Sequence, residues 1–195
     1  MERIERAVEA VERGSSVEVV VRVVPCASRY RVVGMGLALG FALVGLALVL
    51  FTSVVVTEAW VLPNVLAAAL LGALLGKIPA VVRWLLPRRL RRARVREATQ
   101  ASFVTQSVDA TRERTGVHLF VSVLEREIGL YADYGVQGAI PPAEWGLLEK
   151  LARDDKSALP DRLMALLAAL EPLAAQHLPA GEENPNELSN RPIIG

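Results

Sequence analysis

Two long apolar runs in the first half of the chain constrain its fold more than any other feature. The first runs from Val32 to Val56 without a charge, and the second runs from Ala59 to Ile78 with Lys77 as its only charge. A helix needs about 20 apolar residues to cross the hydrocarbon core of a bilayer, so each run is long enough. Each Val, Leu or Phe near a helix centre favours insertion by roughly 0.3 to 0.6 kcal/mol. The sequence therefore predicts a transmembrane helical hairpin over residues 32–78.

The remaining residues are enough for one modest domain in water. Cys26 is the single cysteine, which rules out an internal disulfide, and we expect it to be a small buried hydrophobe. The first 31 residues are charged and contain no apolar stretch of the kind that signal peptides carry. We therefore expect the first apolar run to act as its own uncleaved insertion signal.

Positive charges flank the hairpin on both sides and are absent from its turn. Arg29 and Arg31 precede the first run, and a dense block follows the second run: Arg83, Arg88, Arg89, Arg91, Arg92, Arg94 and Arg96. Because positive flanks stay in the cytoplasm, both termini are predicted to be cytoplasmic, with two helices crossing the inner (plasma) membrane. We expect Arg83, Arg88, Arg89, Arg91 and Arg92 to set this topology and to contact lipid headgroups, at about 1 kcal/mol for each basic residue near the surface. The block has no interleaved aromatic residues, so nucleic acid is not an expected partner.

Each apolar run contains two glycines four positions apart, Gly36 with Gly40 and Gly72 with Gly76. Small residues at this spacing let membrane helices approach closely. Packing within the hairpin is the favoured interpretation, and dimerisation remains open.

The segment before the hairpin must fold together with the segment after it. Residues 2–12 have the apolar spacing of an amphipathic helix, and residues 17–24 are rich in β-branched residues, as strands are. So short a piece buries too little surface to offset its chain entropy. Since both segments are predicted to be cytoplasmic, we expect one domain split in sequence by the hairpin.

The second segment alternates helical and strand-like patterns. We predict a helix over 95–114, strands over 117–124 and 128–132, a loop over 134–138, a helix from Pro142, and a helix over 163–176 that Pro172 kinks or restarts. The expected fold is α/β, a small mixed sheet of three or four strands flanked by helices. The expected parts are residues 1–31 and 95–178 for the domain, 32–78 for the hairpin, 79–94 for a basic juxtamembrane segment, and 179–195 for a polar tail.

Several stretches of the soluble part resemble the TPM domain. Residues 111–122 (TRERTGVHLFVS), 132–136 (ADYGV) and Glu144-Trp145 carry the resemblance, with support from residues 4–25 and from 186–188 (NEL). The chain is most similar to a bacterial branch in which a membrane hairpin interrupts the domain after its first strand. The resemblance implies an α/β sandwich with a central mixed sheet. Some family members have acid phosphatase activity and bind divalent metal through acidic residues, and others look like regulators or assembly factors for membrane complexes. The catalytic branch carries paired aspartates early in the domain, where this chain has Glu12 and Glu18.

The candidate metal ligands are three acidic residues of the second segment. Phosphate-ester hydrolysis without a Ser or Cys nucleophile usually needs a metal held by clustered oxygen ligands. Asp133 lies where a strand meets a loop, and Asp109 and Glu113 lie on the preceding helix. These three residues are the candidate ligands for a divalent cation such as Ca²⁺ or Mg²⁺. The alternative for Asp133 is a turn residue that bonds its own backbone.

Other polar residues have simpler interpretations. We expect residues 125–127 to form a solvated hairpin turn, Asp154 and Asp155 to lie on the surface, and His118 to pack inside its strand. His177 is placed to complement a helix C-terminus. The residue patterns of nucleotide-binding loops, zinc proteases and serine hydrolases are absent.

Two functions follow from this pattern. We favour a membrane-tethered interaction or regulatory module whose domain binds another membrane protein or complex at the bilayer surface. The alternative is a membrane-anchored, metal-dependent phosphatase-like hydrolase that uses Asp133 and its neighbours.

Overall fold

The computed structural model describes residues 2–28, 30–51, 57–106, 108, 111, 113–181, 188 and 191–195. The chain forms two compact units: residues 1–28 join residues 89–195 in the first, and residues 29–88 form the second. The segments before and after the hairpin therefore share one body. The predictions for Asp109 and for residues 186–187 lie outside the described residues.

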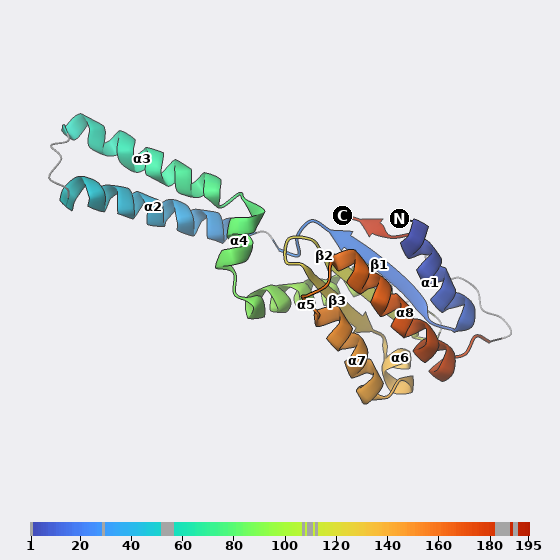
Figure 1. Cartoon of the computed structure of the whole chain (residues 1–195). Coiled ribbons are helices and arrows are strands. Elements are labelled where there is room, and N and C mark those ends of the chain that lie inside the picture. Colours follow the sequence, from blue (N-terminus) through green and yellow to red (C-terminus); the bar gives the residue numbers. More distant parts are fainter. Residues whose placement is uncertain are drawn as a thin grey trace. The chain divides into compact units, whose positions relative to one another are not determined.

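A four-stranded mixed sheet forms the centre of the first unit (Figure 1). Its strands are β1 (Glu18–Val24), β2 (Gly116–Ser122), β3 (Glu127–Ala132) and β4 (Ile193–Ile194), and their order is β3-β2-β1-β4. β1 pairs in parallel with β2 and with β4, whereas β2 and β3 form an antiparallel hairpin. Every residue of β2 is buried, as its near-continuous apolar sequence predicts for a central strand. The predicted small mixed sheet flanked by helices is confirmed.

Helices cover both faces of this sheet. One face is covered by α1 (Glu2–Gly14), α7 (Pro142–Arg153) and α8 (Leu159–His177), and the other by α5 (Arg88–Thr105). The alternation of side chains along β1 produces this division, because successive residues of a strand face opposite sides. Val19 and Val21 enter the large core with α1 and α8, whereas Val20 packs with Phe103 of α5.

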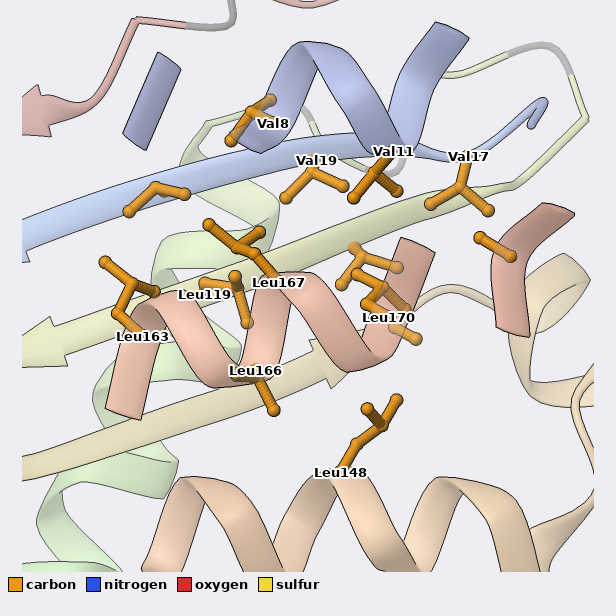
Figure 2. Close-up of a cluster of buried hydrophobic side chains, with 14 of the residues drawn as sticks. Val8, Val11, Val17, Val19, Leu119, Leu148, Leu163, Leu166, Leu167 and Leu170 are labelled. Carbon is orange, nitrogen blue, oxygen red and sulfur yellow. The ribbon is translucent and has the colours of Figure 1, made fainter. Parts of the chain in front are cut away.

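The large core forms where α8 lies across the sheet. Leu163, Leu166, Leu167 and Leu170 are all buried, and their spacing places them on one stripe of the helix (Figure 2). Val8 and Val11 bring α1 into the same core, and Leu148 adds α7. Burial of each such side chain contributes about 1.5 to 3 kcal/mol, so the apolar stripes are what attach these helices to the sheet.

The turn between β2 and β3 is not the solvated turn that the sequence suggests. Glu125 is only 1% exposed, and its carboxylate accepts hydrogen bonds from the Ala27 amide at 3.1 and 3.3 Å and from the Ser122 hydroxyl. Glu127 is also buried, at 5% exposure. The prediction was wrong because Glu125 turns inward to bind the chain that leaves β1 and Glu127 binds Arg92. The turn thereby joins the two sequence segments of the first unit.

Four further details differ from the sequence predictions. Residues 134–138, expected to be a loop, lie in helix α6 (Tyr134–Ala139), which Asp133 caps. The helix expected over 95–114 is α5, which begins directly after Pro87 and ends at Thr105. α8 continues through Pro172, since buried residues on both sides of the proline hold it against the core. The tail is not wholly polar and free: Ile193 and Ile194 pair with the edge of β1 as β4.

Cys26 is exposed, which corrects its assignment as a buried hydrophobe. Pro25 ends β1 just before it, so the alternation that buries the strand's side chains does not extend to Cys26.

The second unit is a helical hairpin. α2 (Arg31–Phe51, 21 residues) and α3 (Glu58–Leu75, 18 residues) are long and apolar enough to cross a membrane, and α4 (Pro79–Leu85) follows them. At 1.5 Å per residue the two helices span about 31 and 27 Å, close to the thickness of a hydrocarbon core of about 30 Å. None of the residues in the most apolar stretch of α2 is buried, and 6% of those in α3 are.

Glycines lie at the closest approaches between α2 and α3. Gly72 lies against the backbone of Leu37, and Gly76 lies against Gly34, so a Cβ at either glycine would clash. The later of these two glycines contacts the earlier residue of α2, as an antiparallel hairpin requires. Gly36 and Gly40 have open space where a Cβ would point, so the close contacts of α2 are made at other positions.

Candidate functional site

The first unit has a groove beside the edge of its sheet. It encloses about 960 Å³, at the upper end of the usual range for ligand pockets. Its floor is β3, one wall is α5, and the other wall is formed by α6 and α7. These four elements come from different parts of the second sequence segment, and the tertiary fold brings them together.

β3 presents an unpaired edge to this groove. In the sheet formed by the described residues β3 is an outer strand, with β2 on one side only. The Asp133 amide donates to the Gly116 carbonyl at 2.9 Å, so this bond shows which residues of β3 have backbone groups that point toward β2. Hydrogen-bonded pairs alternate along such a ladder, so the backbone groups of Ile128 and Leu130 point away from β2 and into the groove.

Two side chains close the ends of the groove. At one end Arg92 of α5 binds the Glu127 carboxylate at 3.1 Å and donates to the Arg153 carbonyl at 3.4 Å, so it links α5 to β3 and α7. At the other end the Gln137 amide donates to the Ala132 carbonyl at 2.6 Å. That bond supplies the outward carbonyl of Ala132 with the partner that a neighbouring strand would otherwise provide. The open part of the edge therefore centres on Ile128 to Leu130.

The two walls differ in chemistry. The wall from α6 and α7 is apolar where Ile140, Pro142 and Trp145 line it. The α5 wall carries Arg96 and Gln100, both exposed. α5 lies close over β3 because Gly129 has no side chain, and a Cβ there would overlap the Thr99 hydroxyl.

Asp133, one of the three predicted metal ligands, makes two local contacts. One oxygen of the Asp133 carboxylate accepts from the Tyr134 amide at 2.8 Å, which is the capping role weighed in the sequence, and the other lies 3.6 Å from the Arg114 guanidinium. Glu113 is exposed, and Asp109 lies outside the described residues. Among the residues that the structure describes, no three His, Cys, Asp or Glu side chains are grouped so that they could hold a metal ion.

Glu12 and Glu18 are both buried. The Glu12 carboxylate accepts from the Val19 amide at 3.0 Å, and that of Glu18 accepts from the Leu188 amide at 3.2 Å. Burial, with the nearby Glu18 charge adding to it, raises the pKa of Glu12 to about 7. The two carboxylates hold α1 and Leu188 to β1.

His118 is fully buried inside β2, as predicted, and takes part in a polar cluster under α5. Its Nε2 lies 3.0 Å from the Ser102 hydroxyl, which also accepts from Arg22 at 2.9 Å. Burial lowers the pKa of His118 to about 4, so the ring is neutral at pH 7. Because the His118 side chain is wholly covered, His118 and Ser102 are arranged for packing rather than for contact with a substrate.

Two of the five arginines predicted to contact lipid headgroups bind other residues of the first unit. Arg91 donates to the Glu125 carbonyl at 3.0 Å, and Arg92 makes the bridge described above. Arg88 and Arg89 are exposed, and Arg83 is half-buried.

The groove contains residues that sequence reasoning did not single out, chiefly Arg96 and Gln137. Arg96 is one of many arginines in its block, and Gln137 fell in a predicted loop. No local signal marks either one, because their roles depend on β3 being an edge strand.

The comparisons with known proteins support the fold but not a family. No family model matches the chain, and no curated protein matches it. A solved structure, the NMR structure of BA42 protein from the psychrophilic bacterium Bizionia argentinensis, is similar with a TM-score of 0.59 at 14% sequence identity. The match covers 100% of this chain and 91% of that one. At this identity the likeness shows a shared fold alone.

Proposed function

We propose that this chain is a membrane-anchored interaction module whose α/β domain binds another membrane protein or complex at the bilayer surface. The observation that carries the proposal is the open edge of β3, which lies in a groove between α5 and α7. An exposed strand edge is a ready template for pairing with another chain, and soluble proteins usually cover such edges. Here the edge is recessed between two helices, which protects it from other sheets and leaves it accessible to a single segment.

The hairpin supports the membrane part of the proposal. Its two helices have the length and composition to cross a bilayer. The arginines on both flanks favour an inner-membrane topology with both termini in the cytoplasm. In that topology both segments of the first unit lie in one compartment, as their joint fold requires. Reporter fusions at each terminus test it, and an extracytoplasmic signal from either end would contradict it.

The resemblance to the TPM domain supports the same proposal. Its strongest stretch, residues 111–145, contains β2, β3 and α6 and the start of α7, which include two sides of the groove. We propose that the first unit is a TPM-type domain of the bacterial branch with an inserted membrane hairpin, and that it acts as a regulatory or assembly module.

Site-specific photocross-linking in living cells tests the proposed function. A benzophenone amino acid at Gln100 lies in the groove wall, and the same group at Arg94 lies on the same helix outside the groove. We expect a discrete cross-linked species from position 100 in the membrane fraction and none from position 94. Equal cross-linking from both positions, or none from either, would contradict an interaction site in the groove.

A further inference from the structure

We propose that the groove accepts an extended segment of the partner as a fifth strand on β3, with apolar side chains toward α7 and acidic side chains toward α5. This inference rests on the proposed function and specifies the chemistry of the partner.

The case for a strand comes from the backbone of β3. Ile128 and Leu130 direct their N–H and C=O groups into the groove, so an antiparallel segment could exchange two hydrogen bonds with each of them. Gly129, Leu130 and Tyr131 are half-exposed along this stretch. Gln137 already bonds the next outward carbonyl, that of Ala132, in the way a paired strand would. This recognition mode takes its affinity from the main chain and its specificity from alternate side chains.

The case for alternating side chains comes from the two walls. Successive side chains of an added strand point to opposite faces of the sheet. Those on one face meet Ile140, Pro142 and Trp145, which favour apolar groups. Those on the other face meet α5 near Arg96 and Gln100.

Among the lining residues that the structure describes, one cation is left available to a ligand. Arg92 binds Glu127, and Arg153 binds Glu149 at 2.8 Å. Glu97 of the lining is bound at 3.0 Å by Arg94, which lies outside the groove. Arg96 is exposed and has no acidic partner among the described residues. The wall therefore favours a carboxylate on the segment that faces α5.

The recessed position of the edge selects a single segment over a second copy of the domain. α5 and α7 flank β3 on both sides, so a second sheet would have to bring its own flanking helices into the same space. Pairing of two β3 edges would also bring the Arg96 side chains of both copies to the same interface.

Peptide binding to the full chain in phosphatidylcholine nanodiscs tests the proposal. The probes are fluorescent seven-residue peptides that alternate valine with aspartate or valine with lysine. We expect the aspartate peptide to bind at least tenfold more tightly than the lysine peptide. R96E should reverse this preference, whereas R13E, the same charge reversal at an exposed arginine of α1 outside the groove, should alter either affinity less than twofold. Equal binding of both peptides, or equal effects of the two variants, would overturn the proposal.

Methylation of the peptide backbone tests the strand geometry separately. In an added strand, the amides of every second residue face β3. N-methyl groups on those residues should weaken binding of the aspartate peptide at least tenfold. N-methyl groups on the other residues should leave binding unchanged. Equal effects of the two sets would overturn strand addition. A dimer in light scattering that R96E alters would show a second copy in the groove and would also overturn the proposal.

The outcomes separate this inference from the proposed function. If the peptides fail to bind but position 100 still cross-links selectively, the interaction module stands and the extended acidic segment is wrong. If the peptides fail to bind and position 100 does not cross-link selectively, both this inference and the proposed function are wrong.

Discussion

Replacing Glu125 with alanine should destabilise the first unit by about 3 kcal/mol. The carboxylate accepts hydrogen bonds from the Ala27 amide and from the Ser122 hydroxyl, and hydrogen bonds to charged groups contribute about 1.5 to 3 kcal/mol each. Their sum is reduced because the native state also bears the cost of burying the charge. Ser122 is fully buried, so its hydroxyl would lose its acceptor in a place that water does not reach.

The assay is urea unfolding of the detergent-solubilised full chain. Trp145 reports on the first unit once Trp60 and Trp84 of the second unit are replaced by phenylalanine. Glu171→Ala is the matched control, because Glu171 is an exposed acidic residue of α8 and exposed changes usually stay within about 0.5 kcal/mol. Hydrogen exchange at the Ala27 amide should accelerate in the Glu125 variant.

The result bears on whether the two sequence segments form one body. Ala27 belongs to the segment before the hairpin and Glu125 to the segment after it. A loss of stability below about 0.5 kcal/mol, equal to that of Glu171→Ala, would refute the reasoning, because the carboxylate would then not hold the segments together.

Three further changes test the core of the first unit. Because the pKa of Glu12 is raised from 4.5 to about 7, the stability from its neutral form is complete below pH 4.5 and is lost as the pH rises through 7. Glu12→Gln should abolish this loss of about 3 kcal/mol in urea unfolding at a series of pH values. The pKa of His118 is lowered from 6.5 to about 4, so stability from the neutral ring is complete above pH 6.5 and falls by about 3 kcal/mol toward pH 4. A His118→Gln protein that kept this acid loss in urea unfolding would contradict the assignment. Gly129→Ala should cost about 1 to 3 kcal/mol in thermal unfolding through overlap with Thr99, and Thr99→Ala should restore part of it; an unchanged melting temperature would show that α5 does not pack closely on β3.

The single sequence is enough to place the apolar elements of this protein. The composition and length of α2 and α3 identify helices able to cross a membrane, because the hydrophobic requirement is local and needs no partner. The same holds for β2, for the leucine stripe of α8, and for Asp133, whose capping bond reaches only the next residue. The need for the two segments to fold together also follows from their sizes alone.

Tertiary structure decided which polar groups are buried and which strand is an edge. Glu125 has the sequence context of a solvated turn, and it is buried because Ala27, nearly 100 residues away, supplies a donor. Ile193 and Ile194 are too short a run to predict a strand, and they pair because β1 has a free edge there. The groove exists because β3 is at the other end of the sheet. Strand order is set by packing between distant segments, and no local pattern of residues records it.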